Sequence, residues 1–416
     1  MSHRPHSAAL RAAALSVAAA SAFALTACGS AGADSGKTQL SFFSWDNEAT
    51  MTPVIEAFEA ENPDIAIEFS NAPPVAEYIS TLQTRLAGDN AADVFVIAAE
   101  NKTNLIEGGF VKDLTDEPFM ADMSPYNTET YSSDGKAYGM STSSWAGGIL
   151  VNRALLDTAG VTEVPTDWDG FLDVVETVKD TGVVPYYDSA TQIPMGLSAM
   201  VGSADAEQGG NVDEAIFDGS AQFGDLWNEP LTAWSELLSR GLMSQDVVSL
   251  TGDQIVDEFA NGRVAMIAAG PWNLPAVREK APDLDVVFAP FPTLDGAGYW
   301  AGAASPGFAI NAKTDHEAEA EAFLSFLGSE EGVRIYQEGT SALTTTGNYT
   351  PVVDPALEPN LAGLQEGRFY LPSIAWPREQ DALSTEAVAQ IQLLAQGQSS
   401  PEDVSAALQA RLESQD

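Results

Sequence analysis

The chain has 416 residues, of which 60 are Asp or Glu and 18 are Lys or Arg, so its formal net charge is −42. A surface of this sign repels phosphate backbones, which excludes nucleic acid as a partner, and the acidity otherwise indicates a well-solvated surface. One Cys rules out an intramolecular disulfide, and only His316 lies outside the N-terminal leader, so a Ser-His-Asp triad or a His-rich zinc site has almost nothing to build on.

The N-terminus has the features of a targeting segment. Arg4 and Arg11 form a basic region, and the apolar, Ala-rich stretch from Ala12 to Ala24 that follows falls short of the roughly 20 residues that a membrane-spanning helix needs. The following Leu25-Thr26-Ala27-Cys28 resembles a bacterial lipobox, in which the Cys is lipidated and becomes the new N-terminus. We therefore predict a signal peptide over 1–27, lipidation of Cys28, and a small-residue tether over 28–37 that holds the protein at the extracytoplasmic face of the cell membrane.

The next part of the chain alternates between strand and helix patterns. A continuous apolar run such as 93–97 is typical of a strand buried on both faces of a parallel sheet. The order β-α-β-α-β predicts an open α/β domain in which ligands bind beyond the carboxyl ends of the strands. The expected strands are 40–44, 65–69 and 93–97, and the expected helices run from Thr52-Pro53 to Glu61 and over 75–87.

The remainder continues in the same mixed pattern. Thr166 is expected to cap a helix, with Asp169 three residues on, and His316 lies in a polar run that looks like an exposed helix start. Strands are predicted at 264–268 and 308–310, and amphipathic helices near 171–180, 226–239, 253–261, 317–327, 385–396 and 401–413.

From about Gln39 onwards the chain resembles the extracellular solute-binding proteins (family 1) of carbohydrate ABC importers. The resemblance depends on the order of several short blocks behind a lipobox, since each block alone is weak. The most specific is Phe259-x2-Gly262-Arg263-x-Ala265-Met266 running into Gly270-Pro271-Trp272. The others are Phe58-x3-Asn62-Pro63-x-Ile65, Asp93-Val94-Phe95, Gly108-x5-Leu114, Gly135 to Met140, Ile149 to Leu156, Pro165 to Phe171 and Gly397-x3-Pro401-Glu402.

This resemblance implies a two-lobed, periplasmic-binding-protein-like α/β fold of class II, with the ligand in a cleft between the lobes. The chain would cross between lobes near Ser143, Ala303 and Gly339. The N-terminal lobe would then comprise 38–143 and 304–339, and the C-terminal lobe 144–303 and 340–416. The implied function is capture of an extracellular mono- or oligosaccharide and its delivery to the permease subunits of an importer by a monomer, with no catalysis, cofactor or metal.

Sugars present hydroxyl rims and apolar faces, so a sugar site pairs flat aromatic rings with carboxylates, amides or Arg. By the resemblance, Trp272 and Trp376 stack on the sugar, and the loops after the first-lobe strands supply polar groups. The predicted ligand-binding residues are Trp272, Trp376, Asp46, Trp45, Glu100, Trp145, Asn101, Trp300, Tyr78 and Arg378. Four other side chains are interpreted as structural: Trp168, Trp227, Trp234 and Asp93.

Three other functions are compatible with these residues. The site could bind a small solute other than a sugar. A secreted glycosidase would need two carboxylates about 5–9 Å apart, for which Asp46 and Glu100 are candidates. An adhesion or signalling lipoprotein would use a surface patch in place of a cleft.

Overall fold

The computed structural model describes residues 36–98, 101–340 and 342–414, and Thr38 onwards forms one unit. The predicted signal peptide, the lipidation site Cys28 and the candidate Glu100 lie outside the described residues. Over the described part of the chain, no helix combines the length and apolar character needed to cross a membrane.

The first sheet has four strands in the order β11-β3-β1-β2. Strand β1 is parallel to both β2 and β3, and β11 is antiparallel to β3. The first three strands alternate with helices, which confirms the open α/β topology predicted from the apolar runs. The strands are β1 (Thr38–Ser44), β2 (Ile65–Asn71), β3 (Val94–Ile97) and β11 (Gly307–Ile310).

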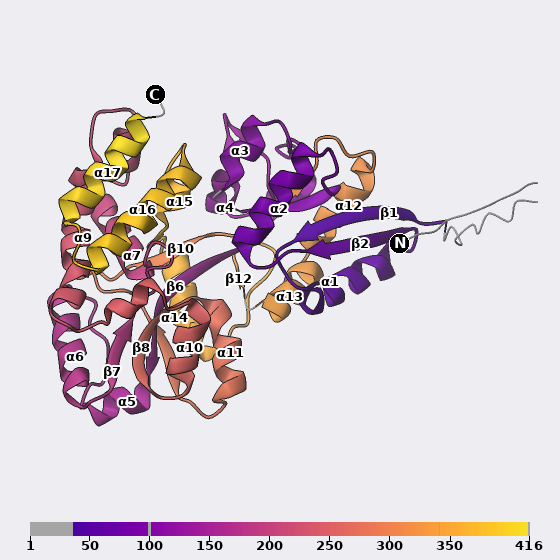
Figure 1. The fold of residues 1–416 in the computed structure, drawn as a ribbon. Coiled ribbons are helices and arrows are strands. Elements are labelled where there is room, and N and C mark those ends of the chain that lie inside the picture. The colour runs from indigo at the N-terminus through magenta and orange to yellow at the C-terminus, as the bar shows by residue number, and fades with distance from the viewer. Residues whose placement is uncertain (1–35, 99–100, 341, 415–416) are drawn as a thin grey trace, which may run out of the picture. The chain divides into compact units, whose positions relative to one another are not determined.

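Helices from two distant parts of the chain cover this sheet. Phe42 of β1 packs against Phe323 of α12, and Phe58 of α1 packs against the same ring, so the core joins the N-terminal segment to residues beyond 300. In Figure 1, α1 and α13 lie next to each other beside β1 and β2. The elements are α1 (Glu48–Glu61), α2 (Val75–Ala87), α3 (Lys102–Glu107), η2 (Pro118–Asp122), α4 (Pro125–Thr130), β4 (Ser132–Ser133), β5 (Lys136–Ala137), α12 (Glu317–Leu327) and α13 (Glu330–Thr340).

Three predicted helix starts are wrong. The helix predicted from 385 is α16 (Gln380–Ala395), which begins five residues earlier. In the other two, a different side chain caps the helix. Helix α1 begins at Glu48, since Asn47 accepts a hydrogen bond from the Thr50 backbone N–H, and Pro53 falls inside the helix. Helix α6 is capped by Asp167, whose Oδ1 accepts from Gly170 N at 2.8 Å. The expected cap, Thr166, donates its hydroxyl to the Gly296 carbonyl.

The second sheet has the order β13-β10-β6-β8-β7, with β12 and β9 also paired to β6. Strand β6 is the long central strand and is antiparallel to β8, β9, β10 and β12. The strands are β6 (Ser143–Asn152), β7 (Val184–Tyr187), β8 (Val264–Ala269), β9 (Val286–Ala289), β10 (Trp300–Ala304), β12 (Leu343–Thr344) and β13 (Phe369–Tyr370).

Helices pack on both faces of this sheet around two hydrophobic clusters. The C-terminal helices α16 and α17 pack with α9, as the yellow and magenta ribbons of Figure 1 show. The elements are α5 (Arg153–Thr158), α6 (Trp168–Asp180), α7 (Met195–Glu207), α8 (Val212–Phe217), α9 (Phe223–Ser239), η3 (Gln245–Val248), α10 (Gly252–Ala260), η4 (Pro271–Asn273), α11 (Leu274–Lys280), η5 (Pro355–Leu357), α14 (Glu358–Gln365), α15 (Pro372–Ala375), α16 (Gln380–Ala395) and α17 (Pro401–Glu413).

The chain passes between the two sheets at three places that lie side by side. Asn127 of α4 is almost fully buried there. Its Nδ2 donates to the Ser143 carbonyl at 2.9 Å and to Thr345 Oγ1 at 3.0 Å. Ser143 Oγ donates in turn to the Ser305 carbonyl. The Asn127 amide and the Ser143 hydroxyl therefore tie together the start of β6, the turn between β10 and β11, and the segment after β12.

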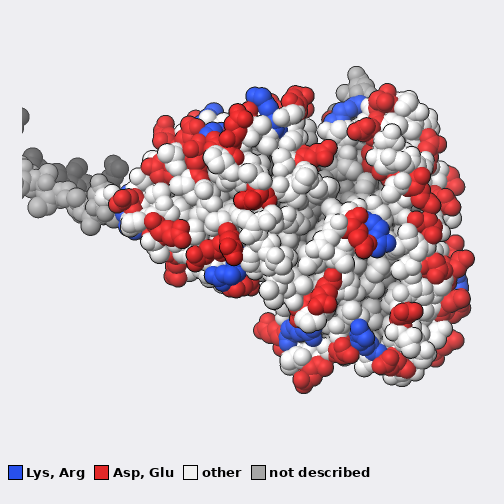
Figure 2. All heavy atoms as spheres, turned by 180° about the vertical axis from the view of Figure 1, so that it is seen from behind, with Lys and Arg blue, Asp and Glu red and all other residues white. Residues whose placement is uncertain are grey.

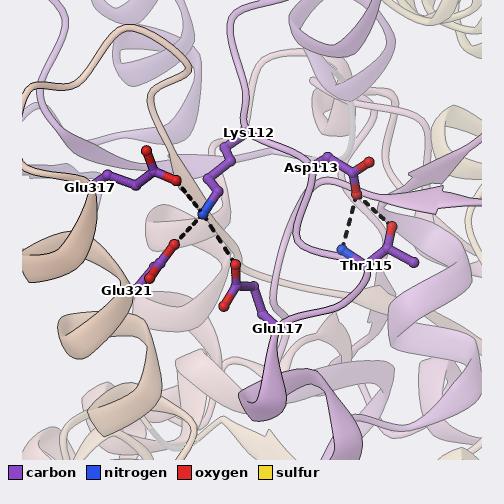
Figure 3. Close-up of polar contacts among 6 residues, drawn as sticks. All are labelled: Lys112, Asp113, Thr115, Glu117, Glu317 and Glu321. Atoms are coloured by element: carbon purple, nitrogen blue, oxygen red, sulfur yellow. Dashed lines mark hydrogen bonds and ion pairs between the residues drawn. The ribbon is translucent and has the colours of Figure 1, made fainter.

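Acidic side chains are spread widely over the face shown in Figure 2, with few basic ones between them. One basic residue nevertheless organises a local cluster. Lys112 Nζ contacts Glu117 at 3.1 Å, Glu317 at 2.7 Å and also Glu321 (Figure 3). Burial acts to lower the pKa of Lys112, but the three carboxylates outweigh it and raise that pKa. The cluster ties the loop before η2 to the start of α12.

We expect Lys112→Gln to lower the free energy of unfolding by about 1 kcal/mol, because the substitution leaves three carboxylates facing one another at a partly exposed site. Urea denaturation in low salt measures this change in the free energy of unfolding, and added salt should make the change smaller. The matched control is Lys136→Gln, which removes a single ion pair, with Asp113, at a more exposed site. Figure 3 shows Asp113, whose carboxylate also accepts a hydrogen bond from Thr115. Equal effects of the two substitutions would contradict the cooperative role of Lys112.

Candidate functional site

Parallel pairing of β1 with β3 brings the predicted first-lobe residues to one edge of the sheet. Asp46 follows the end of β1, and its Oδ2 accepts hydrogen bonds from Ser44 Oγ at 3.0 Å and from Tyr336 Oη at 3.1 Å. Burial raises the pKa of Asp46, while these two hydrogen bonds act to lower it. The carboxylate is thus held in place by α13 and remains partly accessible.

Asn101 lies at the same edge, after β3, and is 1% exposed. Neither its Oδ1 nor its Nδ2 has a hydrogen-bond partner. A buried amide left in this way costs free energy, so a ligand that supplied a donor and an acceptor there would recover it.

Tyr78 does not face a ligand in this structure. Its ring is fully buried and stacks on Phe43 at 4.6 Å. Its hydroxyl donates to the Val96 carbonyl and accepts from the Val96 N–H at 2.8 Å. The edge of the Tyr78 ring also contacts Trp45, whose centroid is 5.3 Å away. Tyr78 therefore joins α2 to β3 and packs against the Trp45 ring.

Two of the predicted tryptophans meet at the carboxyl end of β8. The rings of Trp145 and Trp272 lie 5.1 Å apart at 77°, an edge-to-face arrangement, and Trp272 is 48% exposed. A Cβ on Gly270 would lie 2.3 Å from the Trp272 ring, so only glycine lets the ring fold over this turn. The Gly270 N–H donates to Asn273 Oδ1 at 2.9 Å and holds the turn.

The other predicted aromatic residues are in the core. Trp300 is 2% exposed on β10. Trp376 is fully buried, with its ring 6.0 Å from both Phe223 and Trp227, so neither ring is available to stack on a sugar in this conformation. Arg378 is half-buried, donates to the Phe217 carbonyl at 3.2 Å and lies over the Phe217 ring.

The tryptophans interpreted as structural are buried as well. Trp168 packs on Phe171, and both Trp227 and Trp234 lie on the buried face of α9. Asp93 accepts hydrogen bonds from Ser41 and Thr314, so it joins β1 and β3 to the turn before α12.

A cavity of about 660 Å³ lies between elements that pack on the two different sheets. One wall is formed by α3, α4 and β4, and the other by the end of α7, α8, β13 and α15. Its lining residues are Lys102, Thr103, Ile106, Glu107, Tyr126, Glu129, Thr130, Ser132, Ser133, Asp205, Gly210, Asn211, Asp213, Glu214, Phe369, Tyr370, Leu371, Ile374, Ala375 and Pro377. None of these was among the predicted site residues.

Strand register places this cavity on the same side of the second sheet as Trp145. Trp145 is opposite Ala303 on β10, and Tyr370 is opposite Ala301. Directly paired residues, and residues two apart on one strand, point to the same face. Trp145 and Tyr370 therefore share a face. Strand β10 lies between β6 and β13, so these two strands are roughly 10 Å apart.

Residues of both walls also touch directly across the cavity rim. The Tyr126 ring of α4 lies 4.6 Å from the Phe369 ring of β13. Thr103 Oγ1 of α3 donates to Gln380 Oε1 of α16 at 3.3 Å. The two halves thus also contact each other directly beside the cavity.

Two sheets covered by helices and linked by three adjacent crossovers, with a polar cavity between elements that pack on each, define a two-lobed solute-binding protein with the class II fold. A model of the bacterial extracellular solute-binding protein family matches residues 54–362. The match spans well over half of the chain, and the protein belongs to this family.

Individual relatives agree with this assignment. A family 1 extracellular solute-binding protein from Bifidobacterium longum subsp. infantis is similar in structure, with a TM-score of 0.77 and 32% identity over 91% of this chain and 100% of that one. The multiple sugar-binding protein of Streptococcus mutans is 24% identical over 73% of this chain and 74% of its own. The galactooligosaccharide-binding protein of Bacillus subtilis is 21% identical over 92% of each chain.

Proposed function

We propose that this protein captures a sugar outside the cell and delivers it to an ABC-type importer. A lipid on Cys28 tethers the protein to the membrane that contains the importer. The observation that carries the proposal is the exposed Trp272–Trp145 pair, which lies on the side of the second sheet that also faces the polar cavity. Flat rings beside convergent polar groups match the apolar faces and hydroxyl rims of a sugar. The names of two relatives, the multiple sugar-binding protein and the galactooligosaccharide-binding protein, support the same ligand class.

Six of the predicted residues form the proposed contact set. Trp272 and Trp145 offer ring faces, and Trp45 offers a partly exposed ring. Asp46 and Asn101 offer polar atoms at the edge of the first sheet, and Glu100 follows β3 in the sequence. Trp376, Trp300 and Tyr78 are left out, because their rings are buried. Arg378 stays a candidate at the rim.

The proposed motion is closure of two lobes, 38–143 with 304–339 and 144–303 with 340–416, about the crossovers that Asn127 ties together. A ligand that contacts both lobes binds the closed form more tightly and shifts the population towards it. The importer would then recognise the closed form. The glycosidase reading has no support of this kind, since the matched relatives are named binding proteins.

Thermal melting of the chain from residue 29 onwards, against a panel of neutral mono- and oligosaccharides, tests the proposal. A sugar at 100 times its Kd should stabilise the protein by about 2.7 kcal/mol. Chromatography should recover that sugar intact. An unchanged melting temperature with every sugar would refute sugar binding, and cleavage of a stabilising sugar would replace it by hydrolysis.

A further inference from the structure

The cavity is strongly acidic. Among the described residues, five carboxylates line it, namely Glu107, Glu129, Asp205, Asp213 and Glu214, against one ammonium group, Lys102. The Lys102 Nζ already donates to the Thr130 carbonyl at 2.8 Å, and burial lowers the pKa of Lys102 to about 8. This cation is therefore already hydrogen-bonded, and it is deprotonated at a lower pH than an exposed lysine. A ligand carrying an anionic group would meet repulsion here with little to offset it.

Asp213 differs from the other carboxylates because it is deeply buried. It is 6% exposed on α8, and its Oδ2 accepts a hydrogen bond from the Tyr370 hydroxyl. Its Oδ1 forms no hydrogen bond of regular geometry, and no ion pair among the described residues includes it. The Trp376 indole N–H acts as a weak donor to the same carboxylate and lowers its pKa, while the like charge of Asp205 on α7 raises it.

A buried carboxylate whose second oxygen has no regular hydrogen bond is costly to the ligand-free protein. Burial raises the pKa of Asp213 to about 7, against the opposing effect of Tyr370. Because this pKa lies above the value in the unfolded chain, the folded state binds the proton more tightly. Ionisation of Asp213 as the pH rises towards 8 therefore opposes folding. A hydrogen-bond donor supplied by a ligand would satisfy this second oxygen and remove part of that cost.

Resting on the proposed sugar-binding function, we propose that Asp213 is a specificity-determining residue of the cleft, where it accepts a hydrogen bond from a hydroxyl or ammonium group of the bound sugar. The cavity accordingly takes uncharged or amine-bearing sugars and rejects uronic acids and sugar phosphates. Tyr370 positions the carboxylate from β13, and the neighbouring acidic residues exclude anions.

The test uses the neutral sugar that gives the largest melting shift in the panel, together with its counterpart oxidised to a carboxylate at C6. Titration calorimetry at pH 8 measures both on the unmodified protein and on Asp213→Asn. The matched control is Asp218→Asn at the C-cap of the same helix, an exposed Asp outside the cavity. We expect Asp213→Asn to weaken binding of the neutral sugar at least tenfold without lowering the melting temperature of the ligand-free protein. The control should bind as the parent does.

The acidic counterpart should bind the unmodified protein at least a hundredfold more weakly than the neutral sugar, and Asp213→Asn should narrow that ratio. Unchanged affinity in Asp213→Asn, or equal affinity for the acidic and neutral sugars, would overturn this inference while leaving the proposed function intact. The second measurement needs no variant, so misfolding of Asp213→Asn would not protect the inference. A panel in which no sugar shifts the melting temperature would overturn both.

Discussion

Replacing Trp272 with Ala should weaken sugar binding roughly 50-fold while leaving the fold intact. About half of this side chain is exposed. A Trp ring offers on the order of 200 Å², so a sugar stacked on the exposed half would cover about 100 Å². At ~25 cal/mol per Å² that contact contributes about 2.5 kcal/mol, which corresponds to the stated loss of affinity. Titration calorimetry with the best sugar of the panel measures it.

The control for Trp272→Ala is Val352→Ala, which removes another exposed apolar side chain, 83% exposed, from outside the proposed site. Neither substitution should change the melting temperature of the ligand-free protein by more than a few degrees. Trp272→Phe should recover part of the lost affinity, because a smaller flat ring remains. If Trp272→Ala bound the sugar as tightly as Val352→Ala does, Trp272 would not be a stacking residue.

For Trp376→Ala we expect a loss of about 3–5 kcal/mol in the free energy of unfolding, because the substitution opens a large cavity in a packed core. The ring is fully buried between Phe223 and Trp227, and it lies next to Asp213 rather than facing the cleft. Guanidinium denaturation followed by tryptophan fluorescence measures the loss.

The milder Trp376→Phe keeps most of the volume, so the protein should fold and bind the panel sugar within a few-fold of the parent. That pattern would establish Trp376 as a core residue that supports the site. If Trp376→Phe folded normally but lost most of its affinity, as Trp272→Ala is expected to, the ring would have to leave the core and stack on the ligand when the sugar binds.

Local sequence patterns sufficed to predict much of the fold. The apolar run Val94–Ile97 is a strand buried in a parallel sheet, and the spacing of Ala320, Phe323, Leu324 and Leu327 predicts α12 with both of its ends correct. Such patterns are readable because a strand or helix segregates apolar residues within a few positions of one another. Helix starts were less predictable, since Asn47 and Thr52, or Thr166 and Asp167, are equally plausible caps until the backbone direction is known.

Some residues of the candidate site could likewise be placed from local patterns, and others could not. Trp45, Asp46 and Asn101 follow predicted strands, so their place at one sheet edge could be deduced from the chain order of strands and helices. Trp272 and Trp376 could not be told apart in this way, because both adjoin a proline in a loop. Whether each ring is exposed depends on packing partners, such as Phe223 and Trp227 for Trp376, that lie about 150 residues away in the chain.

The amino-acid sequence by itself determined the family resemblance, the α/β class and the acidic surface, because those depend on composition, on local periodicity and on the order of short blocks. The tertiary structure alone decided which aromatic rings are exposed and which carboxylate oxygen is left without a regular hydrogen bond. Asp213 and Tyr370 form a hydrogen bond across 157 positions of the chain, and Trp145 reaches the same sheet face only through the register of β6, β10 and β13. Burial and unsatisfied hydrogen bonds arise from contacts between distant segments, and no local pattern encodes them.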